Sequence, residues 1–127
     1  MIEFTVHLAN RPGMLATLAE QIADAGVNIE ALAAFGVGEV GMVRLIVTDE
    51  AIARSVLRRA GMSFEERPIT VTTLPHHPGA LASLTRDLAD SGVNIDALYL
   101  LRSSAEGLEL AIGIDDRDLP ENRSGDT

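Results

Sequence analysis

The chain has 127 residues, of which 46% are hydrophobic and only 3% aromatic, with a formal net charge of -9 and no cysteine. This length allows one compact domain or two very small ones. The negative charge excludes nucleic acid as an expected partner, and the lack of cysteine excludes disulfides and thiolate chemistry. No apolar run approaches the roughly 20 residues of a membrane span, so we expect a cytoplasmic protein with no membrane partner.

The first half of the chain predicts a strand, a helix, a hairpin, a second helix and a last strand. Leu15, Leu18 and Ile22 recur at helical spacing, Gly36 to Gly38 favour a hairpin turn, and Asp49 can cap the second helix. In chain order, these elements are expected at Phe4–Leu8, between Gly13 and Gly26, and at Val27–Phe35, Val40–Val47, Glu50–Ala60 and Met62–Glu66.

The second half repeats the beginning of the first after 66 residues, so that Pro78 corresponds to Pro12, and this register is expected to hold without a gap from Asn10–Glu50 to His76–Asp116. Two copies are too few for a solenoid, which favours a pair of similar domains. Beyond Asp116 the chain is polar and is broken by Pro120, which predicts neither helix nor strand. The expected elements are a strand at Ile69–Leu74, a helix at Gly79–Ser91 with Leu81, Leu84 and Leu88 on one face, and hairpin strands at Val93–Leu101 and Gly107–Ile114.

These patterns predict the α+β class, with two ferredoxin-like βαββαβ units built on antiparallel sheets. Residues 1–67 form the complete first domain, residues 68–116 form a second domain that lacks its last helix and strand, and residues 117–127 form a polar, disordered tail. The missing elements leave a sheet face and an edge uncovered, so we expect a homodimer in which a second copy covers them. Apolar surface is also expected on the sheet face without helices, from Leu98 and Leu100 with Leu32 and Ala34.

A strand followed by N-R-P-G-x-L and a helix that ends in A-G-V-N-I resembles the ACT domain, a small regulatory module of enzymes in amino-acid metabolism. The resemblance covers Ile2 to Glu66 as a full unit and Ile69 to Asp116 as a shortened one. Because no catalytic domain accompanies them, the chain is similar to the freestanding tandem ACT proteins of bacteria. The resemblance implies that a small amino acid binds where two ACT units meet and alters how these units or a partner associate.

The residues themselves allow such a site at the start of each first helix. A helix N-terminus offers unpaired N–H groups to a carboxylate, and Gly13 and Gly79 place no side chain over these groups. Asn28 and Asn94 each carry a donor and an acceptor, which suits a zwitterion. The resemblance implies ligand contacts at Asn10, Gly13 and Asn28. The predicted ligand-binding residues are Asn10, Arg11, Gly13, Met14, Leu15, Asn28 and Ile29 in the first copy, and His76, His77, Gly79, Ala80, Leu81, Asn94 and Ile95 in the second.

Other interpretations of these residues stay open. The glycines can simply begin helices and the asparagines can simply tolerate turns. His76 and His77 are adjacent on a turn without a third ligand at metal-site spacing, so no metal or other cofactor is expected, and no catalytic motif is present. We predict a non-catalytic sensor of a small amino acid that acts through assembly or through a metabolic enzyme or regulator. The alternative is a ligand-free ACT scaffold or regulatory subunit that acts through protein contacts.

Overall fold

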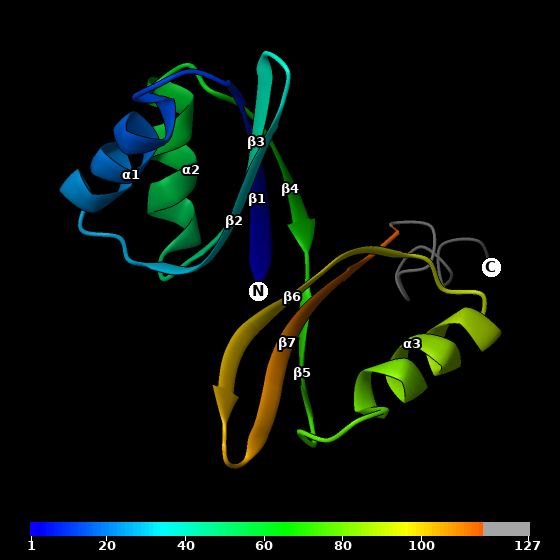
Figure 1. The fold of residues 1–127 in the computed structure, drawn as a ribbon. Coiled ribbons are helices and arrows are strands. Elements are labelled where there is room, and N and C mark those ends of the chain that lie inside the picture. Colours follow the sequence, from blue (N-terminus) through cyan, green and yellow to red (C-terminus); the bar gives the residue numbers. More distant parts are fainter. Residues whose placement is uncertain (116–127) are drawn as a thin grey trace, which may run out of the picture. The chain divides into compact units, whose positions relative to one another are not determined.

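The computed structural model describes residues 1–115, which form three helices and seven strands (Figure 1). The chain divides into two compact units, Met1–Pro68 (unit 1) and the part from Ile69 onward (unit 2). Among the described residues, no helix has both the length and the apolar composition that a bilayer span requires. The elements are β1 (Ile2–Ala9), α1 (Met14–Asp24), β2 (Ile29–Val37), β3 (Val40–Val47), α2 (Glu50–Arg59), β4 (Ser63–Pro68), β5 (Thr70–Leu74), α3 (Ala80–Asp90), β6 (Ile95–Ser104) and β7 (Gly107–Ile114).

Unit 1 is a four-stranded antiparallel sheet with the strand order β2-β3-β1-β4, and α1 and α2 lie on one face of it (Figure 1). The alternation of side chains along a strand assigns each residue to a face. Phe4 and Val6 of β1 are fully buried on the helix side, whereas Glu3 and Thr5 lie on the face without helices. The predicted α+β class and the βαββαβ order of the first unit are confirmed.

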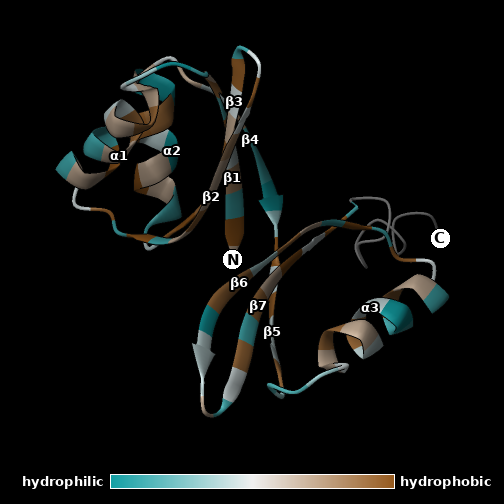
Figure 2. Cartoon of the chain, in the orientation of Figure 1, coloured by the Kyte–Doolittle hydropathy of each residue, from teal (hydrophilic) through white to brown (hydrophobic). Residues whose placement is uncertain are grey.

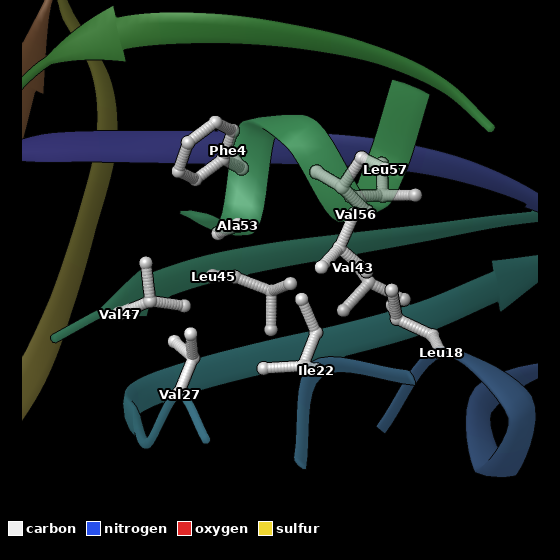
Figure 3. Packing of buried hydrophobic residues seen from close by; sticks show 11 residues of the cluster. Phe4, Leu18, Ile22, Val27, Val43, Leu45, Val47, Ala53, Val56 and Leu57 are labelled. Carbon is white, nitrogen blue, oxygen red and sulfur yellow. The ribbon is translucent and has the colours of Figure 1, made fainter. Parts of the chain in front are cut away.

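The core of unit 1 lies between the sheet and its two helices (Figure 3). It is aliphatic apart from one aromatic ring, as the composition predicted, and each full burial of such a side chain contributes about 1.5–3 kcal/mol. Its members are Phe4, Val6, Leu18, Ile22, Val27, Val43, Leu45, Val47, Ala53, Val56 and Leu57.

The ends of the elements follow the sequence signals, with one correction. Asp49 caps α2 as predicted, because its carboxylate accepts a hydrogen bond from the Ile52 N–H at 3.0 Å. The hairpin turn, however, is shorter than the predicted Gly36 to Gly38. Gly36 and Val37 continue β2 and pair with β3, so only Gly38 and Glu39 connect the two strands.

The described part of unit 2 is a three-stranded antiparallel sheet with the order β5-β7-β6 and the single helix α3. Its sequence fits the shorter fold. Phe4 and Val6, which contribute to the core beside α2 in unit 1, correspond to Thr70 and Thr72 in unit 2. Hydroxyl side chains tolerate contact with water, so this part of the sheet does not need an apolar cover. The expectation of a disordered tail at 117–127 lies outside the described residues.

The repeat of 66 residues does not hold to the end of unit 2. Asn94 follows Asn28 by 66 residues, but Asp115, whose N–H donates to the Asn94 carbonyl, follows its counterpart Thr48 by 67. The extra residue is taken up where the β6–β7 ladder shifts register between Leu100 and Arg102. Such a bulge places two residues of one strand opposite one residue of its partner. The gapless repeat predicted from sequence is therefore wrong beyond this point.

Apolar residues occur toward the hairpin end of β2 and β3, which Figure 2 colours by hydropathy, and several of them are exposed. Phe35, Val37 and Val40 are 52%, 77% and 59% exposed, and their register places them on the sheet face without helices. The prediction that Leu32 and Ala34 lie on that face is wrong. They pair with the core residues Leu45 and Val43, because a register shift between Ile29 and Ala31 changes the alternation. Leu98 and Leu100 likewise pair with the buried Ile112 and Leu110. The predicted exposure of Leu32 and Leu100 is confirmed, since they are 44% and 53% exposed.

Candidate functional site

The turn between β1 and α1 exposes the start of a helix. Gly13 precedes α1 with a φ of 88°, a conformation that favours glycine, and a Cβ built on it would meet nothing within 4 Å. No side chain caps α1, in contrast to α2, which Asp49 caps. The turn before α3 is built in the same way, with Gly79 at a φ of 91° and no side-chain cap. Both turns therefore present the positive end of a helix dipole to solvent.

A pocket of about 200 Å³ lies at this end of unit 1. The turn, the first residues of α1 and the β2–β3 hairpin together form its wall, and most of the wall is apolar. Asn10 and Arg11 provide the polar side chains. Leu15, predicted to face the core, is instead 42% exposed and lines this pocket. The lining residues are Leu8, Ala9, Asn10, Arg11, Met14, Leu15, Ala34, Phe35, Gly36, Gly41, Met42 and Val43.

Asn10 connects the turn to the hairpin. Its Nδ2 donates a hydrogen bond to the Gly38 carbonyl at 2.9 Å, and its backbone N–H donates to the Glu39 carbonyl at 2.8 Å. The side chain lies over Gly36, where an added Cβ would come within 2.4 Å of Asn10 Nδ2. The amide group thus holds two loops of the pocket together, and Oδ1 is its remaining acceptor.

Asn28 and Ile29 lie at the other end of α1. Asn28 is held through its backbone, because its N–H donates to Thr48 Oγ1 and its carbonyl accepts from the Thr48 N–H, each at 3.0 Å. Ile29 is half-buried against the core. A helix of the length of α1, 11 residues, spans about 16 Å. Within unit 1 the structure therefore brings Asn10, Arg11, Met14 and Leu15 together and leaves Asn28 and Ile29 apart.

The predicted residues of unit 2 lie on the turn before α3, at the start of α3 and beyond its end. His76 and His77 are exposed, Ala80 is buried and Leu81 is 43% exposed. Asn94 lies beyond α3, where its Nδ2 donates to Asp96 Oδ1 at 3.4 Å, and Ile95 follows it at the start of β6. A pocket of about 120 Å³ lies at the β6–β7 hairpin, and it contains none of the predicted residues. It is lined by Thr73, Arg102, Ser104, Glu106, Gly107 and Glu109.

Sequence reasoning missed the hairpin side of the unit 1 pocket. Phe35, Gly36, Met42 and Val43 line it, although they follow Asn10 by more than twenty residues. The signal available was the pair of glycines in G-V-G, which was interpreted as the turn itself. Among the described residues, no group of three or more histidine, aspartate or glutamate side chains is placed to hold a metal ion.

Two charge networks of unit 1 lie outside the pocket. Arg54 of α2 forms a two-pronged ion pair with Glu66 of β4, at 2.7 and 2.6 Å. The hydrogen bonds from Arg54 lower the pKa of Glu66 below its ordinary value, and the same bonds raise the pKa of Arg54. On the other sheet face, the buried Glu3 accepts from Arg44 at 3.3 Å and lies 3.5 Å from Arg67.

Comparison with known proteins gives a family match for the first unit and solved structures with a similar fold. Residues 2–60 match the ACT domain. Protein BT0572 from Bacteroides thetaiotaomicron is 25% identical, with a TM-score of 0.82 over 92% of this chain and 81% of that one. The regulatory subunits of aspartate kinase from Thermus thermophilus and Thermus flavus are 16% and 18% identical, with TM-scores of 0.67 and 0.66, each over 89% of this chain and 81% of the other. No curated protein matches the sequence significantly.

Proposed function

We propose, from the match of residues 2–60 to the ACT domain, that the chain is a non-catalytic regulatory protein which binds a small amino acid where two ACT units meet. Ligand binding stabilises one association state of the chain, a homodimer in the simplest case, and an enzyme or regulator responds to that state. This is a population shift, driven by the difference in ligand affinity between the two states.

One observation carries the proposal: the uncapped start of α1 opens beside a mostly apolar pocket. The α-carboxylate of an amino acid would accept hydrogen bonds from the Leu15 and Ala16 N–H groups in the first turn of α1, since the Met14 N–H donates to the Arg11 carbonyl. Arg11 provides a nearby positive charge. The side chain of the amino acid would enter the pocket between Met14 and Ala34. A pocket of about 200 Å³ is smaller than those that hold drug-sized ligands, which suits a single amino acid.

The distance between the two parts of the predicted site supports binding between units. Asn28 is separated from Gly13 by the length of α1, about 16 Å, which a small amino acid does not span. An ACT unit that presents its Gly13 turn to the Asn28 end of another unit would complete the set of contacts. In this arrangement one unit contributes the Gly13 turn and the other contributes Asn28. Ligand binding therefore favours association of the two units.

A thermal-shift screen against the twenty amino acids tests the proposal, with the oligomeric state measured in parallel. A ligand at a hundred times its dissociation constant stabilises the folded chain by about 2.7 kcal/mol, which shifts the midpoint by several degrees. Gly13→Ala should abolish that shift because it disturbs the turn. Gly61→Ala is the matched control, since Gly61 also has a positive φ of 70° and open space around it but lies after α2.

Asn28→Ala should also abolish the ligand response while the fold is retained, because the Asn28 backbone makes the hydrogen bonds to Thr48. Selective stabilisation that survives in both Gly13→Ala and Asn28→Ala would contradict the proposed site. A screen without any response would favour the scaffold instead. The exposed Phe35, Val37 and Val40 then become the first surface to examine for a protein partner.

A further inference from the structure

A second concave surface of unit 1 lies between its two helices, away from the pocket at Gly13. It is a groove of about 360 Å³, formed by the last turns of α1 and α2. Figure 1 shows the two helices on the same face of the sheet. The groove is lined by Gln21, Asp24, Ala25, Val56, Arg59 and Ala60.

One wall of the groove carries uncompensated negative charge. Asp24 lies in the last turn of α1, where the helix dipole already places its negative end, and this turn contains no basic residue. An acidic side chain is unfavourable there. The corresponding Asp90 of α3 pairs with Arg86 four residues earlier, at 3.8 Å, but α1 has Glu20 at that position. Asp24 therefore lacks the partner that its counterpart has.

Gln21 adds an acceptor to the same wall. Its Oε1 is buried and accepts no hydrogen bond from the described residues. Leaving such an atom unpaired is costly, so the site favours a hydrogen-bond donor. Gln21 also lines the groove, and the terminal torsion of its amide is soft. An ammonium group, with three donors, can satisfy both Gln21 and Asp24.

The other wall carries positive charge. Arg59 lies in the last turn of α2 and lines the groove, but it forms no ion pair with Asp24. Its planar guanidinium suits a carboxylate. The floor between the two charges is small and apolar, with Ala25, Val56 and Ala60. A cation and an anion that face one groove without pairing are complementary to a molecule that carries both charges.

We propose that this groove is a second ligand site of unit 1, which binds a small zwitterion. The ligand's ammonium group contacts Asp24 and Gln21, and its carboxylate contacts Arg59. The site requires two helices, and the described part of unit 2 has only α3, so these residues offer no counterpart of the groove. In α3, the residue that corresponds to Gln21 is Asp87.

Titration of the full chain with L-alanine, followed through backbone amide NMR signals, tests this site directly. The amides of Ala25 and Ala60 should shift, and those of Met14 and Leu15 separately report the pocket behind Gly13. N-acetyl-L-alanine and L-alanine methyl ester each keep only one of the two charges. They should bind the groove more weakly by roughly tenfold or more, because each loses a charge-assisted contact.

Two variants and two matched controls complete the experiment. Asp24→Asn and Arg59→Gln should each weaken the alanine-dependent shifts at the groove by roughly tenfold or more. Glu20→Gln and Arg58→Gln change exposed charges on the same helices outside the groove and should leave the shifts unchanged. The site is refuted if Ala25 and Ala60 do not respond, or if their response persists in both groove variants. Gly13→Ala removes only the response at Met14 and Leu15, so the two sites fail independently.

Discussion

The side chain of Asn10 occupies the space that a side chain on Gly36 would need. A Cβ at Gly36 would lie 2.4 Å from Asn10 Nδ2 and 2.6 Å from its Cγ. In this position Asn10 donates to the Gly38 carbonyl and holds the β1–α1 turn against the β2–β3 hairpin. The position of the Asn10 side chain therefore requires glycine at position 36, although 26 positions separate the two residues in the sequence.

Gly36→Ala should displace the Asn10 side chain and destabilise the fold by about 0.5–1.5 kcal/mol, the net contribution of the hydrogen bond to Gly38 that is lost. Amide exchange at the hairpin should increase, since the hydrogen bond to Gly38 is lost. Gly41→Ala is the control, because its added Cβ would meet no atom closer than 3.4 Å. Truncation of Asn10 to alanine in the same chain should recover part of the loss, which a double-mutant cycle measures. Additive effects of the two changes would contradict the coupling.

Much of the fold was predictable because the sequence signals for the ends and the buried faces of the helices agree with the observed elements. Asp49 at the start of α2, Gly26 and Gly61 after the helices, and the apolar stripe of Leu18 and Ile22 all act within a few residues. The Asn10–Gly36 contact was not predictable, since it joins segments that only the sheet brings together. The bulge near Leu101 was also missed, because one added residue changes strand register without changing composition.

The candidate site was predictable in part for the same reason. Gly13 and the uncapped start of α1 are local features, and the sequence motif located them. The separation of Asn28 from this turn follows from the length of α1. Whether the two contribute to one ligand site depends on how the units associate. The groove at Asp24 was not foreseen, because its walls come from two helices whose packing the sequence does not specify.

The Arg54–Glu66 pair should make stability depend on pH in the acid range. The pKa of Glu66 is lowered in the folded chain, so its contribution is complete above its unfolded value of about 4.3 and is lost as pH falls through the folded value. The difference in melting temperature between the native chain and Glu66→Gln should therefore be largest near neutral pH and should shrink below about pH 4. A difference that stays constant down to pH 2 would exclude this pair as the cause.

Glu3 should be the most sensitive carboxylate on the sheet face without helices. It is fully buried and lies 3.3 Å from Arg44 and 3.5 Å from Arg67, and Glu3→Gln removes the negative charge from both contacts. Glu3→Gln should cost about 3–5 kcal/mol in the free energy of unfolding, as for other broken buried ion pairs. Glu65→Gln is the control, since Glu65 is 66% exposed and its pair with His7 should contribute at most about 1 kcal/mol. Equal losses in urea unfolding would show that burial does not distinguish the two pairs.

Asp24→Asn should stabilise the ligand-free chain, although the same change removes the proposed zwitterion contact. The carboxylate lies at the negative end of α1 and four residues after Glu20, so its neutralisation should gain about 0.3–1 kcal/mol. In α3, Asp90→Asn should gain less, because it also removes the pair with Arg86. Thermal unfolding at low and high salt measures both effects, and salt should reduce the gain at Asp24 because it screens the dipole interaction. A loss of stability in Asp24→Asn without ligand would mean that the carboxylate has a structural partner, which would remove the argument for an unfilled site at the groove.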